Sequence, residues 1–89
     1  MKRLNVIVTG LVQGVGYRYF CDRKAREYGI KGWVRNLYNG NVELEIEGEN
    51  GTVNDFIKEL RVGPVSSRVK DVMVVETEFK GNFNSFEIR

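Results

Sequence analysis

The chain has 89 residues, of which 42% are hydrophobic and 29% are charged, and its net charge is +2. This balance fits one globular domain over residues 1–89. The net charge is too small to indicate nucleic-acid binding, since no run of basic residues exists, and no apolar stretch is long enough to cross a membrane. Histidine is absent and Cys21 is the single cysteine, which excludes an internal disulfide and a His- or thiolate-ligated metal and fits the reducing cytoplasm.

The first two predicted elements follow from the spacing of apolar residues. Leu4, Val6 and Val8 alternate along residues 4–9 and indicate a strand with one apolar face. Residues 17–28 carry apolar side chains at helical spacing, which is typical of an amphipathic helix. We expect Gly29 to end this helix.

The next two predicted elements form a hairpin. Residues 32–38 and 41–47 are expected to be strands joined at Asn39-Gly40, a dipeptide that favours a tight turn. The second of these strands alternates apolar residues with a row of three carboxylates: Glu43, Glu45 and Glu47. Such a row can bind a cation, but a sheet with one solvated face has the same alternation. We expect the solvated arrangement.

The remaining elements complete the order βαββαβ. Thr52, followed three residues later by Asp55, resembles a capping box and predicts a second helix that Gly63-Pro64 ends. Residues 69–79 predict a fourth strand with a bulge, because its valines break strict alternation, and residues 83–89 predict a short final strand. We therefore expect an α+β fold of the ferredoxin-like class, a sandwich with two helices on one face of an antiparallel sheet.

The glycine-rich turn at residues 10–18 is a candidate anion site. The following helix has no Ser, Thr, Asp or Asn just before it, so its first N–H groups lack a side-chain cap. Arg18 adds a positive charge in the first turn, where the helix dipole disfavours it. A bound phosphate resolves both faults, and Gly14 and Gly16 permit the backbone conformations of a concave site. The alternative is an ordinary turn with a solvated arginine.

Asn36 is the second candidate residue. It shares a face of the predicted strand with Val34, a natural core residue, so its side chain is expected to point toward the side covered by helices. A buried amide needs hydrogen-bond partners. The Asn36 amide either bonds to nearby backbone or orients a water molecule over the anion held by the turn.

These residues carry a family resemblance that extends over essentially the whole chain. The segment Gly10-Leu11-Val12-Gln13-Gly14-Val15-Gly16-Tyr17-Arg18 resembles the first signature of the acylphosphatases. The segment Gly32-Trp33-Val34-Arg35-Asn36, with Gly40, Val42 and Gly48 at matching spacing, resembles the second. Tyr17 stands where phenylalanine is more common in the family.

The resemblance implies hydrolysis of acyl phosphates, which are carboxyl-phosphate anhydrides, to a carboxylate and inorganic phosphate without metal or cofactor. In that reaction Asn36 positions the attacking water and Arg18 binds the phosphate. The loop supplies the other phosphate-binding residues: Gln13, Gly14, Val15, Gly16 and Tyr17. A carboxylate leaving group needs no general acid, because the pKa of its conjugate acid is about 4. We expect a monomer whose partner is a small-molecule acyl phosphate.

Two other functions fit the same fold. An RNA-recognition domain presents exposed aromatic residues on its central strands, and here the third strand carries carboxylates instead, which repel a phosphate backbone. A non-catalytic relative would keep the phosphate site in order to sense or carry an acyl or carbamoyl phosphate. The presence of both Arg18 and Asn36 argues against it.

Overall fold

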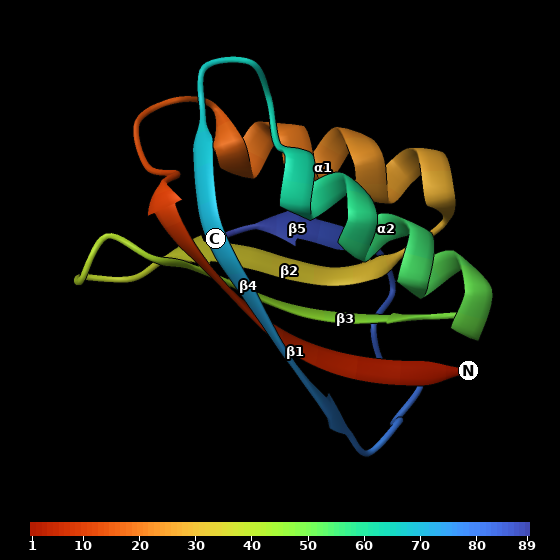
Figure 1. Cartoon of the computed structure of the whole chain (residues 1–89). Coiled ribbons are helices and arrows are strands. Elements are labelled where there is room, and N and C mark those ends of the chain that lie inside the picture. The colour runs from red at the N-terminus through yellow and green to blue at the C-terminus, as the bar shows by residue number, and fades with distance from the viewer.

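The computed structural model describes all of residues 1–89 and places two helices on one face of a five-stranded sheet (Figure 1). The elements follow in the order β1 (Lys2–Leu11), α1 (Tyr17–Tyr28), β2 (Lys31–Asn36), β3 (Val42–Gly48), α2 (Asn50–Val62), β4 (Arg68–Thr77) and β5 (Phe86–Ile88). The predicted order of elements is confirmed. Neither helix is both long and apolar enough to cross a membrane.

The sheet has the strand order β4-β1-β3-β2-β5. Its first four strands pair antiparallel, as expected, whereas β5 pairs in parallel with β2 at the edge. The bulge expected in the fourth strand is present. Thr9 pairs with Asp71 and Gly10 with Val69, so that Lys70 has no partner in β1.

The core lies between the helices and one face of the sheet, and it contains 18 buried residues. The apolar face of β1 and the apolar faces of both helices supply most of it, as their spacing predicts. Cys21 is fully buried there, and burial raises the pKa of its thiol, so this cysteine packs and is not a reactive thiolate.

The start of α2 differs from the prediction. This helix begins at Asn50, with Glu49 at its N-cap position and no side-chain cap hydrogen bond, so the capping role predicted for Thr52 is wrong. The turn of residues 48–51 is shorter than the sequence suggested, because the helix already begins within it. Thr52 lies inside the first turn instead.

The three carboxylates of β3 were expected to lie on a solvated face of the sheet, and this expectation is wrong. Glu45 and Glu47 expose only 9% and 4% of their surface. The guanidinium of Arg3 donates to both carboxylates, at 2.8 Å to Glu45 and 3.2 Å to Glu47. Asn5 donates to Glu43 and Glu45, each at 2.9 Å. We call Arg3, Asn5, Glu43, Glu45 and Glu47 the acidic cluster.

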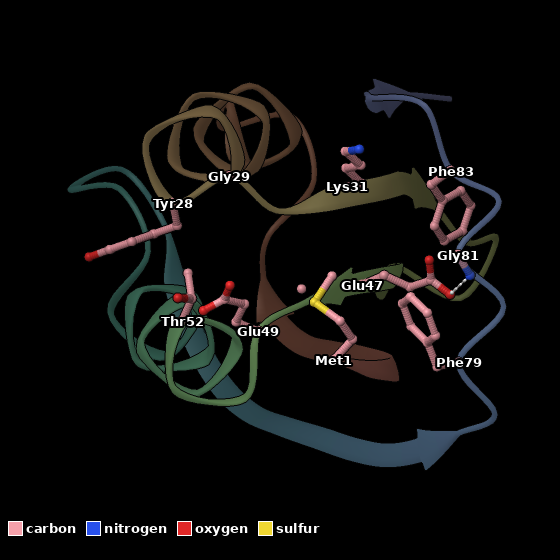
Figure 2. A pocket seen from close by; sticks show the side chains of 11 residues that line it. Met1, Tyr28, Gly29, Lys31, Glu47, Glu49, Thr52, Phe79, Gly81 and Phe83 are labelled. Atoms are coloured by element: carbon pink, nitrogen blue, oxygen red, sulfur yellow. Dashed lines mark hydrogen bonds between the residues drawn. The ribbon is translucent and has the colours of Figure 1, made fainter.

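The segment between β4 and β5 covers one end of this cluster. The main-chain N–H groups of Lys80 and Gly81 donate to Glu47 at 2.9 and 3.2 Å, and Phe79 and Phe83 flank its carboxylate (Figure 2). Burial raises the pKa of Glu47, but these N–H groups and Arg3 outweigh it, and the net pKa is lowered. A carboxylate bonded in this way is a structural anion.

Candidate active site

The turn before α1 has the backbone that its glycines predict. Gly14 and Gly16 have φ angles of 73° and 76°, in the left-handed region, and no residue other than glycine has a positive φ. Gly16 is the N-cap residue of α1, and it provides no side-chain cap. Alternation of left-handed with ordinary residues turns successive N–H groups toward one concave side. The first N–H groups of α1 therefore have no capping side chain to accept their hydrogen bonds.

A cavity of about 200 Å³ lies at this turn and brings together residues from three parts of the chain. It is lined by Val12, Gly14, Gly16, Tyr17, Arg18, Tyr19, Asn36 and Ile88. We call it the site cavity. The two residues singled out by the sequence, Arg18 and Asn36, thus lie on one cavity although 18 positions separate them. Its lining contains no His, Cys, Asp or Glu side chain, so its only formal charge is the positive charge of Arg18.

The guanidinium of Arg18 has no acidic side chain as a partner. Its one hydrogen bond within the protein runs from Nη1 to the main-chain oxygen of Arg89, at 2.8 Å. This contact leaves most of the five guanidinium donors free. It also holds the side chain toward the end of β5, beside Ile88, rather than in open solvent. A half-buried cation with free donors favours an anionic ligand.

Asn36 is exposed and its side chain makes no hydrogen bond within the protein, so the expectation of a buried amide is wrong. The reason is its place in the strand. Val34 lies under the helices and is fully buried, whereas Asn36 is the last residue of β2, beyond the cover that α1 provides. Its amide is thus free both to donate and to accept a hydrogen bond at the edge of the cavity.

Two of the predicted loop residues hold the loop in place with their side chains. Gln13 donates from Nε2 to the carbonyls of Leu37 and Asn41, at 2.7 Å each, and so fastens the loop to the β2–β3 hairpin. The Tyr17 hydroxyl donates to the carbonyl of Leu60 in α2 at 2.7 Å, and burial raises the pKa of this phenol. Only the main-chain groups of these residues remain available to a ligand.

A third tether was missed by the sequence reasoning. The hydroxyl of Ser66 donates to the carbonyl of Val15 at 2.8 Å, and the Val15 side chain is half-buried against the core. Ser66 lies in the turn after α2, where a serine carries no distinctive signal. The loop is therefore fixed from the hairpin, from α2 and from the turn before β4, which favours preorganisation of its N–H groups.

Two further cavities differ from the site cavity. One, of about 310 Å³, shares Asn36 with the site cavity and is lined by Gln13, Asn36, Leu37 and Tyr38. The other, of about 360 Å³, lies at the opposite end of the sheet, near the start of α2 (Figure 2), and includes Lys31, Phe79 and Phe83. None of the predicted site residues lines this distant cavity, although it is the larger one.

Figure 1 shows why one end of the molecule carries the site. The loop after β1, the β2–β3 hairpin and the end of β5 gather at the end of the sheet where α1 begins. The fold and these residues together define a class of protein: a ferredoxin-like domain in which an uncapped helix start, a guanidinium and an unpaired amide line one cavity at the start of its first helix.

The comparison with known proteins identifies the family. The model of the Acylphosphatase family matches residues 4–88, and the chain belongs to this family. An acylphosphatase of Chlorobaculum tepidum is 44% identical over 87 residues, which are 98% of this chain and 95% of the relative.

Solved structures agree. The crystal structure of acylphosphatase from Bacillus subtilis matches with a TM-score of 0.96 at 35% identity, and the match covers 100% of this chain and 99% of the other. An acylphosphatase from Coxiella burnetii matches with a TM-score of 0.94 at 34% identity, over 99% and 92% of the two chains. The predicted fold class and family are confirmed.

Proposed function

We propose that the chain hydrolyses acyl phosphates in the site cavity, with the phosphoryl group held by the main-chain N–H groups of residues 13–18 and by Arg18, and with the attacking water positioned by Asn36. One observation carries these roles: an uncapped helix start, a cation without an acidic side chain as a partner and a free amide all line one cavity. Membership in the acylphosphatase family supports the reaction itself.

The chemistry needs mainly position and charge. The water oxygen forms a bond to phosphorus while the bond from phosphorus to the acyl oxygen breaks, with the two oxygens in line. Arg18 and the loop N–H groups stabilise the charge on the three phosphoryl oxygens that lie around the phosphorus. Two of the three nitrogens of a guanidinium can donate to two of these oxygens in one plane, which an ammonium cannot do.

The electron pair of the broken bond leaves on the carboxylate. Because the pKa of the corresponding acid is about 4, the carboxylate departs without a proton from a general acid. No His, Asp or Glu side chain lines the cavity to act as base, so the proton of the water passes to a phosphoryl oxygen of the substrate. The products are a carboxylate and inorganic phosphate, and no metal takes part.

The proposal also includes the domain organisation, oligomeric state, location and partners of the chain. Residues 1–89 act as a single domain and as a monomer, in the cytoplasm, on a small-molecule acyl phosphate, with no nucleic acid or membrane as partner. The buried free thiol of Cys21 and the family match over residues 4–88 support this setting.

The experiment is a continuous assay of benzoyl phosphate hydrolysis, with and without inorganic phosphate and with and without EDTA. We expect turnover, competitive inhibition by phosphate and no effect of EDTA. The absence of turnover would overturn the proposed reaction. Inhibition by EDTA would overturn the metal-free mechanism alone.

A further inference from the structure

We infer that Ser66 is a positioning residue for the phosphate site: its hydroxyl holds the peptide group between Val15 and Gly16 in the orientation that presents the Gly16 N–H to a bound phosphoryl group. The inference deepens the proposed function and rests on it, because it takes the phosphoryl group to lie in the site cavity. Ser66 lies outside residues 10–18 and 32–36 and outside the cavity lining. It therefore acts through the peptide group and not by contact with the substrate.

The carbonyl of this peptide group has one partner in the protein. The Val15 oxygen accepts the hydroxyl of Ser66 at 2.8 Å, and no main-chain N–H donates to it. The chain has no cis peptide bond, and in a trans peptide group the carbonyl and the following N–H point in opposite directions. Gly14 and Gly16 line the site cavity, whereas Val15 and Ser66 do not. The carbonyl thus points to a residue outside the cavity, and the Gly16 N–H, which no main-chain carbonyl accepts, points the other way.

Without Ser66 the backbone does not fix this orientation. Half a turn of the peptide group changes φ of Gly16 and ψ of Val15. Gly16 has a φ of 76°, and glycine adopts positive and negative φ about equally readily. For Val15, the helical and the extended values of ψ differ by about half a turn, and both are allowed. On the far side of Gly16 the backbone is fixed, because its carbonyl accepts the N–H of Phe20 at 3.0 Å.

The two orientations of the peptide group offer an anion opposite partners. The observed one adds the Gly16 N–H to the uncapped donors at the start of α1. The rotated one replaces this donor by the Val15 carbonyl oxygen, which repels phosphoryl oxygens. The apparent affinity for phosphate is proportional to the population of the orientation that binds it. Ser66 raises that population before the ligand arrives.

The turn between α2 and β4 holds Ser66 beside the loop after β1 (Figure 1). Ser67 closes this turn from within, because its hydroxyl and its main-chain N–H both donate to the carbonyl of Pro64, at 2.8 and 2.9 Å. The ring of Pro64 also fixes φ at that position. The two adjacent serines therefore differ: Ser67 bonds within its own turn, and Ser66 bonds to a loop 51 residues away.

The test compares Ser66→Ala, Ser66→Thr and Ser67→Ala with the wild type in benzoyl phosphate hydrolysis and in its inhibition by inorganic phosphate. Loss of one neutral hydrogen bond changes the ratio of two conformations roughly two- to tenfold. We therefore expect Ser66→Ala to raise the inhibition constant of phosphate by that factor and to lower kcat/KM at least as much. Ser66→Thr retains the hydroxyl at an exposed position and should keep the wild-type constant.

Ser67→Ala is the matched control. It removes a serine hydroxyl from the same turn, while the main-chain N–H of residue 67 keeps the turn closed, so the inhibition constant should not change. An equal rise in Ser66→Ala and Ser67→Ala would overturn the inference, as would a rise in Ser66→Thr as large as that in Ser66→Ala. A lowered melting temperature of Ser66→Ala with unchanged inhibition would also overturn it, because Ser66 would then be purely structural.

The wild type separates this inference from the proposed function. If the wild type neither hydrolyses benzoyl phosphate nor binds phosphate, the proposed function fails, and the inference fails with it. If the wild type hydrolyses benzoyl phosphate and phosphate inhibits Ser66→Ala equally well, the proposed function stands and the role of Ser66 alone is refuted.

Discussion

Arg3 and Arg18 are both half-buried guanidinium groups, but their surroundings are opposite. Arg3 lies in the acidic cluster, where it donates to Glu45 and Glu47 and where its charge is balanced by carboxylates that are themselves bonded to Asn5, Thr77 and backbone N–H groups. Arg18 lies at the site cavity with a single hydrogen bond, to the main-chain oxygen of Arg89, and without an acidic side chain as a partner. The protein supplies carboxylate partners for the guanidinium of Arg3 but leaves most donors of the Arg18 guanidinium without a partner.

The contrast separates structural from functional polarity. A polar group whose partners are all supplied by the fold stabilises the folded state, and breaking its network costs stability. The guanidinium of Arg18, whose donors are mostly unpaired, the free amide of Asn36 and the uncapped helix start contribute little to folding, and an external ligand can bond to all three. Substitutions in the acidic cluster should therefore change stability, and substitutions at the cavity should change activity.

The largest effect is expected from Arg18→Lys. The ammonium retains the charge but loses the planar, two-pronged grip on phosphoryl oxygens, so we expect kcat/KM for benzoyl phosphate to fall roughly 10³-fold or more. Arg23→Lys, on an exposed position of the same helix, is the control and should retain activity. Hydrolysis by Arg18→Lys at close to the wild-type rate would remove Arg18 from the site.

Asn36→Ala comes next. Loss of the amide that places the water should lower kcat about 10²-fold, by analogy with the loss of one oxyanion-hole donor, while inhibition by phosphate persists. Because Asn36 is exposed and has no partner, the free energy of unfolding should change by no more than about 0.5 kcal/mol. Asn54→Ala, an exposed position of α2, is the control. A lowered melting temperature with retained turnover would show that Asn36 is purely structural.

Glu47→Gln sharpens the other side of the comparison. The amide cannot accept strongly from Arg3 and from the N–H groups of Lys80 and Gly81 at once, so we expect a loss of roughly 1–3 kcal/mol in the free energy of unfolding. Urea denaturation measures this loss, and Glu78→Gln, in the exposed part of the same segment, should have almost no effect. Glu47→Gln should leave kcat unchanged, and a catalytic defect of the folded protein would contradict the separation.

The smallest effect concerns pH. The pKa values of Glu43 and Glu47 are lowered: burial opposes the shift, but hydrogen bonds from Asn5 and Arg35 to Glu43, and from Lys80, Gly81 and Arg3 to Glu47, outweigh it. Since the unfolded chain then binds protons more readily, this stabilisation is complete above the ordinary carboxyl pKa of 4.5 and is lost as pH falls through the lowered values. The free energy of unfolding should decline with acidification in that range, and less steeply in Glu47→Gln. Equal slopes in both proteins would contradict the assignment.

Local features of the sequence predicted local structure well. Helix α1 begins after Gly16 and ends before Gly29, as predicted, because each glycine adopts a left-handed conformation that interrupts the helical hydrogen bonds. The sequence indicated that α1 lacks a side-chain cap, because no Ser, Thr, Asp or Asn stands just before the helix. The meeting of Arg18 and Asn36 followed from the element order, because the turn after the first strand and the end of the second lie at the same end of the sheet.

Features that depend on distant contacts were not predictable. Glu47 is buried only because backbone 33 and 34 residues away folds over it, and alternation within β3 contains no sign of that. The Gln13 side chain bonds to carbonyls 24 and 28 residues away, and nothing in the sequence around it indicates these contacts. Alternation with Val34 led to the prediction that Asn36 is buried under the helices. Asn36 is exposed instead, because alternation within a strand does not show where the helices stop covering it.

The central claim is that an oxyanion completes the start of α1, and a titration of ¹⁵N-labelled protein with inorganic phosphate tests it most directly. The account predicts saturable chemical-shift changes of the main-chain amides of residues 13–18 and of the Asn36 side-chain amide. The Kd from these changes should equal the constant with which phosphate inhibits benzoyl phosphate hydrolysis. Shifts confined to other parts of the chain, or none at concentrations that inhibit hydrolysis, would contradict it.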